Sequence, residues 1–262
     1  MTSRLRLGYP TRLLQGSLRE KIPRVATFGA NGIQLDLRNE LRATELTDTG
    51  RRQLLHLASE HGLAIAPPVF PLRRALVEQE GLEARMAALN AALRFAATLG
   101  ADVLIVRPGS LPAAGSGERP LFAELLNDLA RSGDHVGVMP ALTTGRDPVE
   151  LLKEILEEVT AAPIGVNLDP AASVMAGHDP AETVRSLSGS LRHVRVRDGL
   201  REGDDAGLEV PVGRGEVDWE SLLAALVEIG FGDWLTPDRT TGEDTARDAA
   251  QAISYVSNVM PF

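Results

Sequence analysis

The chain has 262 residues, of which 44% are hydrophobic and 24% charged, and its formal net charge is −9. The length suits one large domain with a buried core, the composition excludes global disorder, and the acidic balance argues against a general nucleic-acid binder. The chain has no cysteine, which excludes disulfides, thiolate metal sites and cysteine nucleophiles. The N-terminal residues lack the apolar core of a secretory signal, and no apolar stretch reaches the roughly 20 residues of a membrane helix. We therefore expect a cytoplasmic protein with neither a membrane nor a nucleic-acid partner.

Short runs rich in valine, isoleucine and leucine recur along the chain, and each is followed by a helical pattern. The runs cover residues 5–8, 32–36, 63–67, 102–107, 135–142, 164–169, 193–198 and 233–238. Eight such alternations are typical of a closed (β/α)₈ barrel, which usually takes about 250 residues. The rival fold, an open doubly wound sheet, usually has a G-x-G-x-x-G turn after its first strand, and this chain has none there. We predict a single (β/α)₈ TIM barrel, an α/β fold, over residues 1–262.

Polar side chains at the strand ends are the candidates for a site, because barrel enzymes place their chemistry at the C-terminal ends of the strands. Successive side chains of a strand point to opposite faces, which predicts the inward-facing set. That set is Gln34, Asp36, Asn167, Asp169, His193, Arg195, Arg197, Trp234, Thr236 and Asp238, with Thr143 added if Val138, Pro140 and Leu142 face the helices. Carboxylates and guanidinium groups are seldom buried in a barrel unless they are paired. We predict a functional site here, with structural ion pairs as the alternative for any single residue.

Arginine supplies almost all of the positive charge, and several arginines fall at or just after strand ends. These are Arg73, Arg74, Arg107, Arg195, Arg197 and Arg201. Guanidinium groups bind phosphate or carboxylate in bidentate geometry, so we expect an anionic substrate contact, with Arg73 and Arg74 as the first candidates and solvated loop charges as the alternative. His178 follows the sixth strand and is a further candidate for the barrel mouth. His135 and His193 are predicted to begin strands, at the end away from the site.

Four segments of the second half carry a family resemblance. They are I-G-V-N-L-D-P (164–170), H-V-R-V-R-D (193–198), P-V-G-R-G-E-V-D-W (211–219) and D-W-L-T-P-D (233–238). Residues 29–36 and 99–104 of the first half carry the same resemblance more weakly. The G-x-G-x-x-D-W pattern is fairly specific, and the other segments are specific only in combination. Together they resemble the xylose isomerase-like TIM barrels of the sugar phosphate isomerase and epimerase family, a group that also contains the endonuclease-four nucleases.

The resemblance implies a divalent metal ion (Mn²⁺, Mg²⁺, Co²⁺ or Zn²⁺) held by Glu, Asp, His and Glu at the ends of strands five to eight. Such an ion polarises the sugar oxygens while carboxylates move a proton between neighbouring carbons. In this chain the four positions fall on Thr143, Asp169, Arg195 and Asp238. Asp169 and the shorter Asp238 therefore remain as candidate catalytic groups and metal ligands, whereas an arginine cannot ligate a cation.

We predict that Arg195 lies between Asp169 and Asp238 as an internal counter-ion, at the position where the family holds its metal. The substrate-contact candidates are Asp36, Arg73, Arg74, Arg107, Arg195, Arg197, Arg201 and His178. The expected function is that of a sugar or sugar phosphate isomerase or epimerase with a degenerate metal site and altered or lost catalysis. The alternative is a non-catalytic homologue that binds a small polyol or anion at the barrel mouth. Barrels of this type often pair, so a homo-oligomer is a further expectation.

Overall fold

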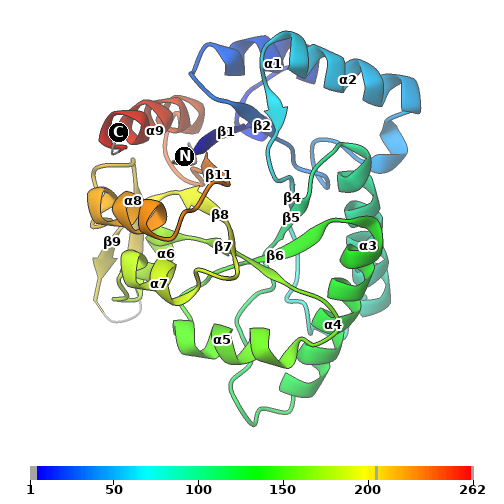
Figure 1. The fold of residues 1–262 in the computed structure, drawn as a ribbon, viewed down its shortest axis with the longest axis vertical. Coiled ribbons are helices and arrows are strands. Elements are labelled where there is room, and N and C mark those ends of the chain that lie inside the picture. Colours follow the sequence, from blue (N-terminus) through cyan, green and yellow to red (C-terminus); the bar gives the residue numbers. More distant parts are fainter. Residues whose placement is uncertain (1–4, 204–205, 261–262) are drawn as a thin grey trace.

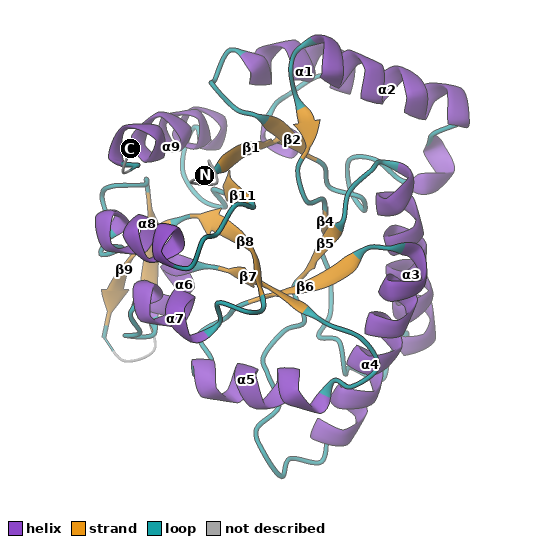
Figure 2. Ribbon diagram, in the orientation of Figure 1, coloured by secondary structure: helices purple, strands orange, loops and turns teal. Residues whose placement is uncertain are grey.

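In the computed structural model, which describes residues 5–203 and 206–260, a parallel sheet is surrounded by helices (Figures 1 and 2). Its strand order is β3-β2-β1-β11-β8-β7-β6-β5-β4. The strands are β1 (Arg6–Pro10), β2 (Gly32–Gln34), β3 (Ala64–Ile65), β4 (Val69–Phe70), β5 (Val103–Val106), β6 (Met139–Thr143), β7 (Gly165–Leu168), β8 (Leu191–Val196) and β11 (Trp234–Pro237). Each pair of neighbours is parallel, as repeated β–α alternation requires.

Closure of the barrel depends on a single interrupted strand. Pro67 and Pro68 separate β3 from β4, and a proline has no N–H to donate to a ladder. Beyond the interruption, the Val69 N–H donates to the Leu35 carbonyl at 2.9 Å, and the Leu37 N–H donates to the Val69 carbonyl at 2.9 Å. These bonds join β4 to the segment that follows β2, so β3 and β4 together act as the third strand. The predicted (β/α)₈ barrel is confirmed.

Helices cover the outside of the barrel (Figure 2). They are α1 (Leu18–Ala26), α2 (Asp48–Glu60), α3 (Leu82–Thr98), α4 (Arg119–Val136), α5 (Val149–Glu158), α6 (Pro170–Met175), α7 (Pro180–Ser186), α8 (Trp219–Glu228) and α9 (Thr245–Val259), with short 3₁₀ turns at Thr11–Leu13 and Ala43–Glu45. Outward-facing strand residues such as Ile33, Leu104, Val166 and Val194 are fully buried in this layer. Over residues 5–203 and 206–260, none of the helices combines the length and apolar character that crossing a membrane requires.

Two strand boundaries differ from the sequence prediction, and each difference changes the position of a histidine within its helix or strand. Helix α4 continues to Val136 and ends at Gly137, whose φ of +71° stops the helix, so β6 begins only at Met139. His135 therefore lies in the last turn of α4, and the prediction that it begins a strand was wrong. Strand β8 begins at Leu191, so His193 lies inside the strand rather than at its start.

A hairpin follows β8 where the sequence suggested an acidic loop over residues 201–208. Strands β9 (Asp198–Glu202) and β10 (Ala206–Val210) pair in antiparallel fashion, and residues 204–205 lie outside the described part. The hairpin packs against α6 (Figure 1). A Cβ added at Gly199 or Gly207 would overlap the Met175 side chain, so glycine at these positions permits the close packing.

The G-x-G-x-x-D-W segment is held in place by one buried carboxylate. Asp198 accepts hydrogen bonds from the backbone N–H groups of Gly199 (2.9 Å), Gly213 (2.9 Å) and Val217 (3.1 Å), and from Trp219 Nε1 (3.2 Å). The residue is fully buried, and these donors offset the cost of burying its charge. Asp198 therefore fixes the G-x-G-x-x-D-W segment, which carries the most specific family resemblance, next to the C-terminal end of β8.

Candidate functional site

A cavity of about 270 Å³ lies where the strands of the barrel end. This volume is close to the lower limit of about 300 Å³ for small-molecule sites. Its polar lining includes Gln34, Asn167, His193, Arg195, Thr236 and Asp238, which strand alternation predicts to face inward. Val69, Phe70 and Ile105 form an apolar wall. The cavity therefore occupies the face of the barrel on which the sequence predicts a site.

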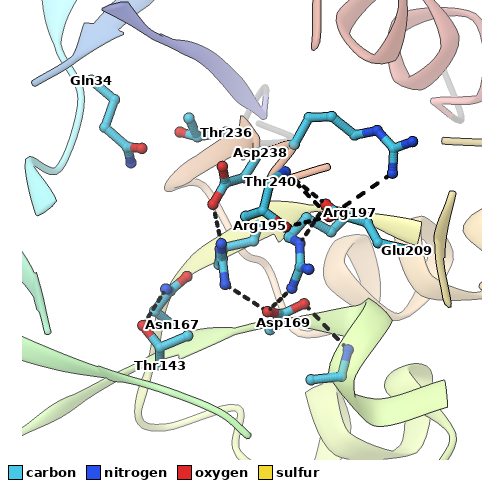
Figure 3. A network of polar contacts seen from close by, with 12 residues as sticks. Gln34, Thr143, Asn167, Asp169, Arg195, Arg197, Glu209, Thr236, Asp238 and Thr240 are labelled. Atoms are coloured by element: carbon cyan, nitrogen blue, oxygen red, sulfur yellow. Dashed lines mark hydrogen bonds and ion pairs between the residues drawn. The ribbon is translucent and has the colours of Figure 1, made fainter. Parts of the chain in front are cut away.

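Arg195 lies between two carboxylates at the edge of this cavity (Figure 3). Its Nη1 donates to Asp169 Oδ2 at 2.6 Å, and its Nη2 donates to Asp238 Oδ2. The side chains are 13%, 1% and 11% exposed for Arg195, Asp169 and Asp238, so water screens these contacts only weakly. The contact that the sequence predicts for these three residues is present.

The ion pairs continue on both sides of Arg195. Arg12 Nη2 donates to Asp238 Oδ1. On the other side, Arg197 Nη1 donates to Asp169 Oδ2 at 2.5 Å, and Arg197 Nε donates to Glu209 Oε1 at 3.1 Å (Figure 3). Guanidinium groups and carboxylates therefore alternate in the order Arg12, Asp238, Arg195, Asp169, Arg197 and Glu209. Each charged group contacts at least one group of opposite charge.

These contacts hold the groups in their ionised forms. Burial alone would raise the pKa of Asp238, but the charges of Arg195 and Arg12 outweigh burial and keep that pKa well below its usual range. Burial would likewise lower the pKa of Arg195, but Asp238 and Asp169 raise it above its ordinary value. Neither group can therefore exchange a proton near neutral pH.

A row of neutral polar groups lies beside the ion pairs. Asn167 Nδ2 donates to Thr143 Oγ1 at 2.9 Å, and Asn167 Oδ1 lies 2.7 Å from His193 Nδ1. An amide oxygen only accepts, so with this amide orientation Nδ1 carries the proton, and Nε2 accepts from Thr236 Oγ1 at 2.9 Å. Burial, with a smaller effect of the Arg195 charge, lowers the pKa of His193 to about 3. His193 is therefore neutral and borders the cavity, which corrects its predicted place at the far end of the strand.

Asp36 and Arg107, two of the candidate substrate contacts, also line the cavity, but in different states. Asp36 Oδ1 accepts from the backbone N–H groups of Arg38 (2.8 Å) and Asn39 (2.9 Å), and its Oδ2 accepts from Asn39 Nδ2 (2.9 Å). Its loop therefore uses both carboxylate oxygens. Arg107 is exposed and makes no hydrogen bond or ion pair with any described residue.

Five of the predicted substrate contacts are not among the residues that line the cavity. One is Arg197, whose guanidinium is paired with Asp169 and Glu209. Arg73 borders a separate groove beside α3, and Arg74 pairs with Glu80 at 3.0 Å and with Glu78. The other two are Arg201, whose Nε donates to the Gly203 carbonyl in the hairpin, and His178, which is exposed beside a small hollow near α7. The sequence indicates which strand each residue follows, but the path of the loop carries the last four side chains outward.

Among the residues that the sequence prediction omitted, three polar ones take part in the site. Arg12 comes two residues after β1, so the strand-end rule applied to the first strand would have identified it. Glu209 is on the far strand of the hairpin, and besides Arg197 it accepts from the Thr240 N–H at 3.1 Å and from Thr241 Oγ1 at 3.1 Å. Thr240, which follows β11, lines the cavity. No local pattern marks Glu209, because only the antiparallel pairing of the hairpin brings it to Arg197.

The residues at the four positions of the implied metal site do not fit a divalent cation. Arg195 donates hydrogen bonds to both remaining carboxylates, and a guanidinium has no lone pair to offer a metal. At the fourth position Thr143 is neutral and already accepts a hydrogen bond from Asn167. Among the residues that the structure describes, no three His, Asp or Glu side chains converge as metal ligands.

The family described as "Xylose isomerase-like TIM barrel" matches residues 22–256. Similar solved structures include a xylose isomerase domain protein from Planctomyces limnophilus, at 20% identity and a TM-score of 0.83, with 97% of this chain and 95% of that one covered. D-psicose 3-epimerase from Clostridium cellulolyticum H10, solved with D-tagatose, has 14% identity and a TM-score of 0.78, covering 98% and 100%. The 3-keto-D-glucoside 4-epimerase of E. coli has 13% identity and a TM-score of 0.78, covering 97% and 100%. No curated protein sequence matches the chain. From the family match, this chain belongs to the xylose isomerase-like TIM barrels.

Proposed function

We propose that this protein binds a small sugar-like molecule, a polyol or an anion, in the cavity at the strand ends, without a divalent metal ion and without isomerase turnover. The observation that carries the proposal is the Arg195 guanidinium between Asp169 and Asp238. It supplies, as part of the chain, the positive charge that the family obtains from a metal ion.

The absence of a suitable base supports binding rather than turnover. Moving a proton between carbons requires a general base whose pKa lies near the working pH. Among the described groups lining the cavity, Asp238 has a strongly lowered pKa, and His193 has a pKa of about 3 with its free nitrogen hydrogen-bonded to Thr236. Asp36 already accepts three hydrogen bonds. None of these carboxylate or imidazole groups is poised to take a proton from a sugar carbon.

The shape of the cavity supports a sugar-sized ligand. One wall is apolar, formed by Val69, Phe70 and Ile105, and the facing side is polar, with Arg195 and Thr236. Pockets of this mixed kind bind small molecules through apolar contact and orient them by a few polar groups. A similar fold is that of an epimerase solved with D-tagatose, a sugar ligand of that enzyme.

A metal-dependent isomerase or epimerase is the second candidate, because both Asp169 and Asp238 remain in the family positions. Thermal unfolding of EDTA-treated protein separates the two candidates. We expect no stabilisation by Mn²⁺, Mg²⁺, Co²⁺ or Zn²⁺, and stabilisation by a member of a panel of sugars, polyols and sugar phosphates. Stoichiometric binding of a cation, or sugar turnover that responds to added cation, would overturn the proposal.

A double variant tests whether Arg195 stands in for the metal. Thr143→Glu with Arg195→His restores the four donor types that the family uses, so we expect Mn²⁺ or Co²⁺ to stabilise the variant and not the parent. Saturating metal at 100 times its Kd adds about 2.7 kcal/mol to the free energy of unfolding. Arg195→Gln with Thr143→Glu serves as the control, since it removes the guanidinium without supplying an imidazole. Equal responses of parent, variant and control to metal would contradict the role given to Arg195.

A further inference from the structure

The charged donors of the cavity are not matched by unpaired carboxylates. Arg107 makes no hydrogen bond or ion pair with a described residue, and Arg12 uses only its Nη2, on Asp238, among the described contacts. Both carboxylates of the lining are already occupied, Asp238 by Arg12 and Arg195, and Asp36 by the loop that follows β2. The cavity therefore offers guanidinium N–H groups and no unused carboxylate oxygen.

This imbalance favours one class of ligand. A neutral polyol brings about as many donors as acceptors, and its hydroxyl donors find only neutral acceptors here, such as Gln34 Oε1, and no unpaired carboxylate. Its neutral hydroxyl oxygens can accept from a guanidinium, but they form weaker hydrogen bonds with it than a charged oxygen does. A carboxylate or phosphate group brings acceptors only and fits a guanidinium in bidentate geometry.

The placement of Arg107 shows how such a ligand would lie. Arg107 and Ile105 are two residues apart at the end of β5, so both point to the cavity side of the strand. Phe70 lies on β4, which pairs with β5. An anionic group at Arg107 would thus place the carbon skeleton of the ligand on the apolar wall. The cavity of about 270 Å³ suits a small metabolite rather than a nucleotide.

We infer that the ligand of this site is a small hydroxylated oxyanion, a carboxylate or a phosphate monoester, bound by Arg107 with Arg12 as the second cation. This inference rests on the proposed function and narrows it from polyols and anions to anions. The chain as a whole carries a net charge of −9, so an anion gains nothing from long-range attraction, and the local guanidinium groups must supply the affinity.

Calorimetric titration with matched pairs of ligands tests the inference on the intact, EDTA-treated protein. The pairs are D-gluconate against D-glucitol, and D-glucose 6-phosphate against D-glucose, which differ chiefly in the anionic group. We expect at least one anion to bind ten or more times as tightly as its neutral partner, and the pair that responds distinguishes carboxylate from phosphate.

Variants locate the contact. Arg107→Gln should weaken binding of the anion by about 10- to 100-fold, the range expected for a charge-assisted hydrogen bond. The affinity for the neutral partner should fall much less, because a neutral oxygen gains less from a charged donor. Arg94→Gln is the matched control, because Arg94 is an exposed arginine of α3 outside the cavity and its loss changes the net charge equally. Arg107 is itself exposed, so its replacement should leave the fold intact, which circular dichroism verifies.

The possible failures are distinguishable. If neutral polyols bind as tightly as the anions, or if Arg107→Gln and Arg94→Gln weaken anion binding equally, the inference is wrong and the proposed function stands. If neither class binds, the proposed function fails together with the inference. If an anion binds only after a divalent cation is added, the proposal of a metal-free site is wrong. The preference for anions would then come from the cation and not from Arg107.

Discussion

At the scale of single residues, the decisive feature is that Arg195 is paired on two sides. A buried ion pair adds little net stability, because burying two charges costs about as much as their attraction returns. Removing one partner is different, since it leaves an uncompensated buried charge. The arrangement at Asp169 and Asp238 therefore determines the charge state and geometry of the site more than the stability of the molecule.

His193 gives a prediction about pH at the same scale. Its pKa is about 3 in the folded protein, against an ordinary value of 6.5, so between these values the unfolded chain binds a proton that the folded one excludes. The free energy of unfolding should therefore fall as the pH decreases from 6.5 toward 3, by up to about 1.4 kcal/mol per pH unit from this residue. Urea unfolding of the parent and of His193→Gln at several pH values measures the difference in slope.

The control for this measurement is His56→Gln, because His56 is an exposed histidine of α2. The His56 variant should retain the slope of the parent, whereas His193→Gln should flatten it. The slope is informative even if His193→Gln lowers stability at every pH by losing its bonds to Asn167 and Thr236. An unchanged slope in His193→Gln would show that the imidazole is not held neutral by the fold.

At the scale of elements, the segments after β8 shape one side of the site. The β9–β10 hairpin delivers Glu209 to Arg197 and to the loop after β11, while Asp198 holds the residue 213–219 segment by its backbone. Both carboxylates act by organising chain that is remote in sequence. A family-typical glycine pattern thus has a structural explanation in this protein.

Gly215→Ala tests that explanation. A Cβ at Gly215 would overlap the Asp198 carboxylate and the Gly199 carbonyl, both of which are fixed by their own hydrogen bonds. We expect a loss of stability of about 1–3 kcal/mol, as for other positions where added atoms displace packed neighbours. Gly189→Ala is the control, because a Cβ there meets no atom within 4 Å. Chemical denaturation of both variants gives the comparison, and equal stabilities would show that the loop adjusts freely.

At the scale of the whole molecule, one continuous apolar cluster links the strands to the helices around the barrel, from Leu7 in β1 to Val256 in α9. A shared core of this kind favours cooperative unfolding. We predict one transition in urea, with tryptophan fluorescence and far-ultraviolet circular dichroism giving the same midpoint. Trp219 and Trp234 are both buried, so their emission reports on the core. Two separated midpoints would contradict the predicted single domain.

The cytoplasmic location, the lack of a nucleic-acid partner and the homo-oligomer stay predictions from the sequence.

Much of the architecture and part of the site follow from local sequence patterns. Apolar runs alternating with helical segments predict the barrel, and strand alternation places Asp169, Arg195 and Asp238 on its inner face, where Arg195 contacts both carboxylates. Charge pairing among these three is then expected, because unpaired charges are rarely buried. These properties depend on side-chain type and on the regular geometry of single strands, which is why the sequence alone determines them.

The rest was decided only by the tertiary structure. Arg12 reaches Asp238 across 226 residues of sequence because the first and last strands of the barrel pair. Glu209 reaches Arg197 because a hairpin reverses the chain, and Arg73 lies outside the cavity because its loop turns toward α3. Loop paths and barrel closure depend on contacts summed over the whole chain. No short-range pattern of residues contains that information.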